Sequence, residues 1–196
     1  MDELAELVKK YGSNKLKEGY MPIYEFYVNK WKDKEINLME IGVSSGASIE
    51  MWHEYFKKAN IYGIDIRPET KFEKERIEIY IGDQTDEEFL KGVCKDKQFD
   101  IIIDDGGHKM SQQIGSFKIL WEYLKSGGLY VIEDLHTSYY NKFLDLDHTT
   151  MDFLLTKLND LNLSGKREYT IDDLNEYEKT IEFIHFYKSI VFIKKR

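Results

Sequence analysis

Short apolar segments alternate with amphipathic segments of helical period along most of this 196-residue chain. The apolar runs are too short for buried helices and have the length of buried strands. They predict five strands, over residues 36–41, 61–66, 77–81, 99–104 and 129–133. Helices are predicted between them, over residues 47–58, 86–93 and 110–124. Because a helix between two strands serves as a crossover, this order indicates a mostly parallel sheet.

The last part of the chain follows a different pattern. Strands are predicted over residues 180–186 and 190–194, separated by only Tyr187-Lys188-Ser189. So short a link can join only antiparallel neighbours. We therefore expect an α/β fold with a doubly wound, Rossmann-like sheet of seven strands, mostly parallel, that ends in an antiparallel C-terminal edge hairpin. A turn at Ser126-Gly127-Gly128 and a helix over residues 149–161 complete the pattern.

The first 35 residues carry two helical patterns, over residues 2–10 and 20–31. We expect residues 1–35 to form an N-terminal helical segment that packs on the core, and residues 36–196 to form the main domain. The whole chain would then be a single domain, for which 196 residues bury a sufficient core.

The charge balance excludes some partners. The chain has 36 acidic and 28 basic residues, a net charge of −8, which argues against nucleic acid as the main partner. No apolar run approaches the roughly 18 residues that suggest a membrane span. The single Cys94 cannot form an intrachain disulfide, and the acidic start at Met1-Asp2-Glu3 does not resemble a secretory signal. We expect a cytoplasmic protein.

Acidic clusters follow two of the predicted strands. One is Asp104-Asp105-Gly106-Gly107-His108, and the other is Glu133-Asp134-Leu135-His136. Carboxylates at the ends of parallel strands project into the crevice where such folds bind ligands. Asp105, Glu133 and Asp134 are therefore expected to converge on one divalent cation, Mg²⁺, Ca²⁺ or Mn²⁺. His108 is expected to act as a base, and Asp104, which points away from Asp105, is expected to be structural or to lie on the cofactor side.

A turn of small residues follows the first predicted strand. Glu40-Ile41-Gly42-Val43-Ser44-Ser45-Gly46 leads into a helix whose first amide groups favour a ligand. Gly42 and Gly46 let the backbone approach such a ligand closely, although tight turns need glycine in any case. Asp65 lies 19 residues beyond Gly46, where an acid typically binds ribose hydroxyls. The spacing is G-x-x-x-G rather than G-x-G-x-x-G, which disfavours a nicotinamide-dependent oxidoreductase.

These motifs resemble a known family. The segments Glu40–Gly46, Tyr62–Asp65 and Gly82-Asp83-Gln84 are similar to the S-adenosylmethionine site of class I methyltransferases. The blocks Ile103–His108 and Val131–Tyr139 resemble, more narrowly, the metal-dependent sugar O-methyltransferases of macrolide biosynthesis, the mycinamicin type. Tyr11–Lys15 and His185–Val191 are also similar to that group. The resemblance covers roughly residues 11–194.

The resemblance implies a role for each matching residue. Asp105, Glu133 and Asp134 would hold Mg²⁺, with His108 as the general base. The cofactor S-adenosylmethionine would contact residues at successive strand ends: Glu40 and Gly42 at its methionine end, Asp65 at its ribose, and Asp83 and Gln84 near its adenine. Ser44 stands where the family usually has a glycine. His136 is expected to orient a ligand carboxylate or to have a structural role at the helix entry.

The resemblance and the residues together predict an S-adenosylmethionine- and Mg²⁺-dependent O-methyltransferase. The methyl acceptor would be a saccharide or a glycosylated small molecule. Tyr139 and Tyr140 are expected either to stack on a sugar ring of this acceptor or to pack against the sheet. One alternative is an O-methyltransferase that acts on a catechol-type small molecule. Another is a binding or scaffold protein that has the methyltransferase fold but no longer catalyses a reaction. The family also suggests a homo-oligomer.

Overall fold

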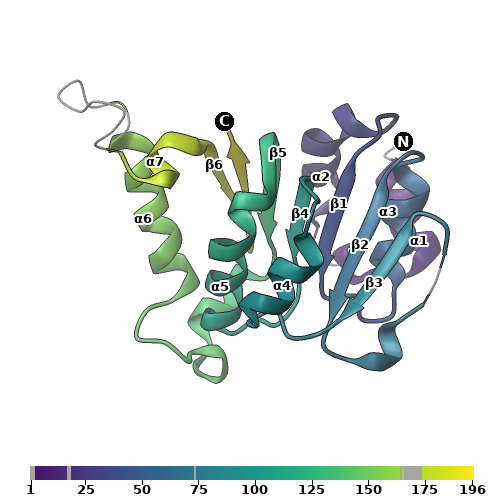
Figure 1. The fold of residues 1–196 in the computed structure, drawn as a ribbon, viewed down its shortest axis with the longest axis horizontal. Coiled ribbons are helices and arrows are strands. Elements are labelled where there is room, and N and C mark those ends of the chain that lie inside the picture. The colour runs from purple at the N-terminus through teal and green to yellow at the C-terminus, as the bar shows by residue number, and fades with distance from the viewer. Residues whose placement is uncertain (1–2, 17–18, 73, 164, 166–173) are drawn as a thin grey trace. The chain divides into compact units, whose positions relative to one another are not determined.

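The computed structural model describes residues 3–16, 19–72, 74–163, 165 and 174–196 (Figure 1). Seven strands within these ranges form one mixed sheet in the order β3-β2-β1-β4-β5-β7-β6, which confirms the expected α/β fold. The chain divides into two compact units, the first ending at Asp83 and the second beginning at Gln84. Each unit is described by itself below.

The first unit is a parallel three-stranded sheet with helices. Its strands are β1 (Asn37–Ile41), β2 (Asn60–Asp65) and β3 (Ile77–Ile81). Its helices are α1 (Glu3–Tyr11), α2 (Met21–Val28) and α3 (Ala47–Tyr55), with short 3₁₀ turns η1 (Asn14–Leu16), η2 (Asn29–Trp31) and η3 (Pro68–Thr70). Asp2, the first residue of the predicted opening helix, lies outside the described residues. Because β1 and β2 are parallel, with Glu40 paired to Gly63, their carboxyl ends lie at the same edge.

The second unit combines parallel and antiparallel pairing. Its strands are β4 (Phe99–Asp104), β5 (Leu124–Ile132), β6 (Ile181–Tyr187) and β7 (Ile190–Lys195). Its helices are α4 (Glu87–Cys94), α5 (Met110–Leu120), α6 (Thr150–Leu163) and α7 (Glu176–Thr180), with 3₁₀ turns η4 (Trp121–Tyr123), η5 (Leu135–Tyr139) and η6 (Asn141–Phe143). β4 and β5 are parallel, so Asp104 and Ile132 end their strands side by side. β7 is antiparallel to both β5 and β6, which confirms the edge hairpin.

The start of β5 differs from the sequence-based expectation. Ser126-Gly127-Gly128 was expected to be a turn before the strand, whereas β5 begins at Leu124 and runs through these residues. The pairing moves from Phe99 with Leu124 to Ile101 with Leu129, so the register shifts at this point and β5 carries a bulge-like irregularity. Gly127 has φ of 78°, a conformation that costs a glycine little. A bulge and a turn favour the same residue types, glycine among them, so the sequence alone does not distinguish the two.

A short helix before β6 was missed. Thr180 was expected to begin a strand, but it ends α7. Asn175 caps this helix, because its side chain accepts hydrogen bonds from the backbone N–H groups of Tyr177 and Glu178. Five residues are too few to show helical periodicity, so only the cap residue signals this helix.

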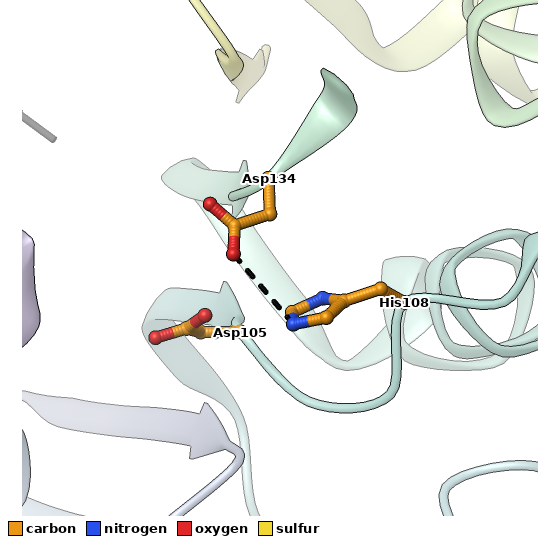
Figure 2. A group of neighbouring side chains, drawn as sticks. All are labelled: Asp105, His108 and Asp134. Carbon is orange, nitrogen blue, oxygen red and sulfur yellow. Dashed lines mark ion pairs between the residues drawn. The ribbon is translucent and has the colours of Figure 1, made fainter. Parts of the chain in front are cut away.

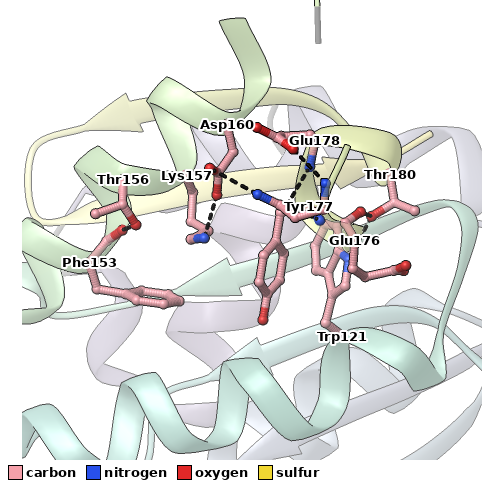
Figure 3. Close-up of polar contacts among 10 residues, drawn as sticks. Trp121, Phe153, Thr156, Lys157, Asp160, Glu176, Tyr177, Glu178 and Thr180 are labelled. Atoms are coloured by element: carbon pink, nitrogen blue, oxygen red, sulfur yellow. Dashed lines mark hydrogen bonds and ion pairs between the residues drawn. The ribbon is translucent and has the colours of Figure 1, made fainter. Parts of the chain in front are cut away.

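The α6 and α7 helices are packed together by polar and aromatic contacts (Figure 3). The Lys157 ammonium pairs with Asp160 and lies 4.1 Å from the centroid of the Tyr177 ring. The Trp121 indole N–H donates to Thr180 Oγ1 over 2.9 Å. These contacts attach the C-terminal helices to the body of the second unit. No helix in the described ranges is both long and apolar enough to cross a membrane.

Candidate active site

The turn after β1 is built for close approach to its backbone. Gly42 donates its N–H to the Ile64 carbonyl over 2.8 Å, and Gly46 donates to Val43 over 2.8 Å. Three residues of this turn have positive φ: Gly42 (94°), Ser44 (51°) and Gly46 (82°). The left-handed conformation of Ser44 explains why a glycine is usual there in the family that the motif resembles.

Asp65 ends β2 and holds this turn in place. Its carboxylate accepts hydrogen bonds from the backbone N–H of Ser44 over 2.9 Å and of Arg67 over 3.0 Å. Burial alone would raise the pKa of the Asp65 carboxyl, which is 8% exposed, but the Arg67 guanidinium and the two N–H groups lower it below its usual value. Asp65 is therefore a stable anion at neutral pH, and a carboxylate is the group that accepts hydrogen bonds from ribose hydroxyls.

Glu40 forms a buried ion pair that the sequence reasoning missed. The ammonium of Lys15, in η1, lies 3.1 Å from Glu40 Oε1, and the two side chains are 1% and 0% exposed. The only sequence signal for this pair was the resemblance of the Tyr11–Lys15 block to the family. Because the Lys15 ammonium balances the negative charge of the Glu40 carboxylate, the Glu40 side chain can stay buried at the end of β1.

Replacing Lys15 by methionine is expected to destabilise the protein strongly. The variant leaves the Glu40 carboxylate buried without its ammonium partner, which typically costs about 3–5 kcal/mol of the free energy of unfolding. Urea denaturation measures this loss. Lys32→Met is the matched control, because it removes an ammonium from the far more exposed pair with Glu3, worth at most about 1 kcal/mol. Equal losses in the two variants would show that burial does not make the Lys15–Glu40 pair more important for stability than the Lys32–Glu3 pair.

Asp83 and Gln84, both expected near an adenine, have different surroundings. Asp83 follows the end of β3 and is partly exposed. Gln84 is buried, and its amide is bonded to other residues of the second unit, Gly107 and Ser116. The adenine role of both residues stays a prediction.

The second unit brings together three of the expected residues at the ends of β4 and β5. Asp105, His108 and Asp134 each offer a ligand atom, and these atoms all lie within 4.8 Å of one another (Figure 2). His108 Nε2 lies 3.6 Å from Asp134 Oδ2. All three residues are partly exposed. Two carboxylates fit a divalent cation such as Mg²⁺ or Mn²⁺, which can also bind an oxygen atom of a substrate, and the imidazole lies close enough to exchange a proton with that oxygen.

Glu133 is not part of this group. It is buried, its backbone N–H donates to the Asp104 carbonyl over 3.0 Å, and its own carbonyl accepts from Gln113 Nε2 over 3.1 Å. The next residue, Asp134, has φ of 57°, so the chain turns sharply between the two acids. The structure places Asp134 beside His108. Metal binding by Glu133 stays a prediction.

The His108 ring is held from one side by an aromatic residue. The Phe143 ring in η6 meets it edge to face, with 5.9 Å between centroids. His108 Nδ1 is buried and has no hydrogen-bond partner among the described residues, while Nε2 faces Asp134. Nε2 is thus the nitrogen positioned to exchange a proton with a group bound near Asp105 and Asp134. Phe143 carried no recognisable sequence signal.

Asp104 points into the protein. It is buried, and Gln84 Nε2 lies 3.4 Å from its Oδ1. Burial raises the pKa of the Asp104 carboxyl to about 8, although hydrogen bonds from Gly106 and Gln84 oppose this. Asp104 is therefore largely protonated near neutral pH. This supports the structural role that was one of its two expected roles, and contact with the cofactor stays a prediction.

His136, Tyr139 and Tyr140 lie just beyond Asp134. His136 Nδ1 is 2.5 Å from Ser189 Oγ, so the histidine links η5 to the β6–β7 turn. Tyr139 and Tyr140 are 74% and 54% exposed, and are not packed against the sheet. The Tyr140 ring meets His136 edge to face at 5.9 Å. Exposed tyrosine faces beside a possible metal site are suited to stacking on a sugar ring.

Comparison with known proteins identifies the fold family. Residues 39–135, from β1 to the residue after Asp134, match a family described as a methyltransferase domain. Residues 39–135 belong to this family of methyltransferase domains. The match includes the glycine turn, Asp65 and all three residues of the possible metal site.

Several relatives of this methyltransferase-family chain act on sugars attached to other molecules. An enzyme of Streptomyces olivaceus, 8-demethyl-8-alpha-L-rhamnosyl tetracenomycin-C 2'-O-methyltransferase, is 30% identical over 98% of this chain and 54% of its own length. Mycinamicin VI 2''-O-methyltransferase of Micromonospora griseorubida is 28% identical over 98% of this chain and 52% of its own. The chain thus spans about half the length of these relatives.

Solved structures extend the comparison. The MycE methyltransferase of the mycinamycin biosynthetic pathway, in complex with Mg and SAH, has a TM-score of 0.91 and 28% identity, over 98% of this chain and 54% of that one. A putative caffeoyl-CoA O-methyltransferase from Staphylococcus aureus has a TM-score of 0.56 and 16% identity, which shows a shared fold alone.

Proposed function

We propose that this chain transfers a methyl group from S-adenosylmethionine to a hydroxyl of a saccharide or glycosylated small molecule, with the help of Mg²⁺. The observation that carries the proposal is the group formed by Asp105, His108 and Asp134. Relatives that match nearly the whole chain are sugar O-methyltransferases, and one of them was solved with Mg and SAH. A scaffold protein without catalytic activity has no chemical need for two carboxylates and a histidine held close together, which favours an enzyme.

Each residue has a chemical task in this proposal. Asp105 and Asp134 would hold the metal, together with Glu133 if its side chain turns toward them. A bound Mg²⁺ supplies electrostatic stabilisation for the negative charge that develops on the acceptor oxygen. His108 Nε2 would accept the hydroxyl proton. The reaction then forms an O–CH₃ bond and breaks the S–CH₃ bond, giving a methyl ether and S-adenosylhomocysteine.

The cofactor would be bound by residues of the first unit. Asp65, an anion held by Ser44 and Arg67, would accept hydrogen bonds from the ribose hydroxyls. The backbone of Gly42 and Gly46 would lie against the methionine part, near Glu40. The acceptor would contact His136, Tyr139 and Tyr140. That the chain forms a single domain with residues 36–196 as its catalytic part, acts in the cytoplasm and assembles as a homo-oligomer remains a prediction.

Calorimetric titration of S-adenosylhomocysteine tests the proposal. We expect a dissociation constant on the order of micromolar in the presence of Mg²⁺, corresponding to about −8 kcal/mol. Chelation with EDTA should leave cofactor binding largely intact and abolish methyl transfer, because the metal acts on the acceptor. A screen of rhamnosides and catechols with labelled S-adenosylmethionine then identifies the acceptor class. Absence of cofactor binding in both conditions would refute the enzyme proposal, and transfer to catechols alone would refute the saccharide acceptor.

A further inference from the structure

The loop that carries Asp105 and His108 is held by side chains rather than by regular structure. It connects the end of β4 at Asp104 to the start of α5 at Met110. Two of its backbone N–H groups are bound by side chains: Gly107 by Gln84 and Lys109 by Gln112. These two contacts hold the backbone on both sides of His108.

Gln84 makes the shorter of these two bonds. Its Oε1 accepts the Gly107 N–H over 2.6 Å. At the other end of the amide, Nε2 donates to Ser116 Oγ over 2.8 Å and lies 3.4 Å from Asp104 Oδ1. Gln84 is also buried. The amide thus connects the end of β4, the loop and α5, and it binds the residues that immediately precede Asp105 and His108.

The opposite side of the loop is closed by Gln112. A Cβ atom on Gly107 would lie 2.2 Å from Gln112 Oε1, so the backbone of the loop touches this side chain. Ser116, the partner of Gln84, also donates to the Gln112 carbonyl over 2.8 Å. The loop is therefore fixed between two glutamines that are linked through Ser116.

We propose that Gln84 is a positioning residue that fixes the loop of residues 105–109 so that Asp105 and His108 face Asp134. This inference rests on the proposed function, because it concerns the geometry of the same metal and base site. It also differs from the adenine role that the family resemblance implies for Gln84. Both ends of the buried amide are engaged within the second unit, and the two hydrogens of Nε2 are directed to Ser116 and Asp104.

Gln84→Met tests the inference. The variant keeps the length of the side chain and removes both its acceptor and its donor. We expect the affinity for Mn²⁺, used as a probe of the metal site, to fall by about 10-fold or more, as for residues that orient metal ligands. The affinity for S-adenosylhomocysteine should change less than about twofold. Gln84→Glu keeps an acceptor for the Gly107 N–H, and its Mn²⁺ affinity should lie between those of Gln84→Met and the unmodified protein.

Thr180→Val is the matched control. It removes the hydrogen bond between Trp121 and Thr180 in the same unit, far along the chain from the loop, and should leave Mn²⁺ affinity unchanged. Loss of cofactor affinity with full Mn²⁺ affinity in either Gln84 variant would overturn the positioning role in favour of the adenine role. Lower thermal stability with unchanged Mn²⁺ affinity would overturn it in favour of a purely structural role. Absence of Mn²⁺ binding to the unmodified protein would instead refute the proposed function itself.

Discussion

His108→Ala is expected to lower the rate of methyl transfer by about 10²–10⁴-fold, the usual contribution of a general base. The physical reason is that an aliphatic hydroxyl holds its proton too tightly to attack near pH 7, and Nε2 is the ring nitrogen that faces the acidic pair. The affinity for S-adenosylhomocysteine should be unchanged, because the expected cofactor contacts come from other residues. Single-turnover methyl transfer with an identified acceptor, together with calorimetry, measures both quantities.

The same variant separates two roles for His108. The histidine lies close enough to Asp105 and Asp134 to act as a metal ligand instead of a base. As a base, it can be lost without weakening Mn²⁺ binding; as a ligand, its loss weakens Mn²⁺ binding and turnover together. His148→Ala is the control, since this histidine pairs only with the exposed Asp147 in the described contacts and should affect neither quantity. Unchanged turnover in His108→Ala would remove the residue from the mechanism.

Asp105→Asn is expected to weaken Mn²⁺ or Mg²⁺ binding by at least roughly 100-fold, more than the 10–100-fold typical of residues one step removed from a metal. The substitution keeps the size of the side chain and removes the negative charge, which a hard dication requires. Methyl transfer should fall with it, and higher Mg²⁺ concentration should recover part of the activity. Titration of the enzyme with Mn²⁺ and the Mg²⁺ dependence of the rate both measure the effect.

The control for this variant is Asp147→Asn. Asp147 is an acid of the second unit with a histidine neighbour, as Asp134 has, but it is almost fully exposed. Its amide variant should bind the metal normally. If Asp105→Asn retained normal metal affinity, the metal would have to be bound elsewhere, and Glu133 with Asp134 would be the next pair to test.

The order of strands and helices was predictable because each element carries its own local signal. β1 to β4 were expected within a residue of their observed ends, since a buried strand appears as a short apolar run wherever it lies in the sheet. The bulge at the start of β5 and the short helix α7 were not predictable in this way. Gly127 gives the same signal in a bulge as in a turn, and α7 is too short for periodicity.

The candidate site likewise has features that local sequence patterns predict and features that depend on tertiary contacts. The sequence by itself indicated that Asp105 and Asp134 follow the ends of two strands of one mostly parallel sheet and that His108 follows Asp105 within one loop, because parallel strands bring their carboxyl ends to one edge. Only the tertiary structure decided that Lys15 pairs with Glu40 and that Gln84 holds Gly107. It also decided that Asp134 lies beside His108. These contacts join residues whose separation along the chain carries no periodic signal, so they become visible only once the packed chain brings the side chains together.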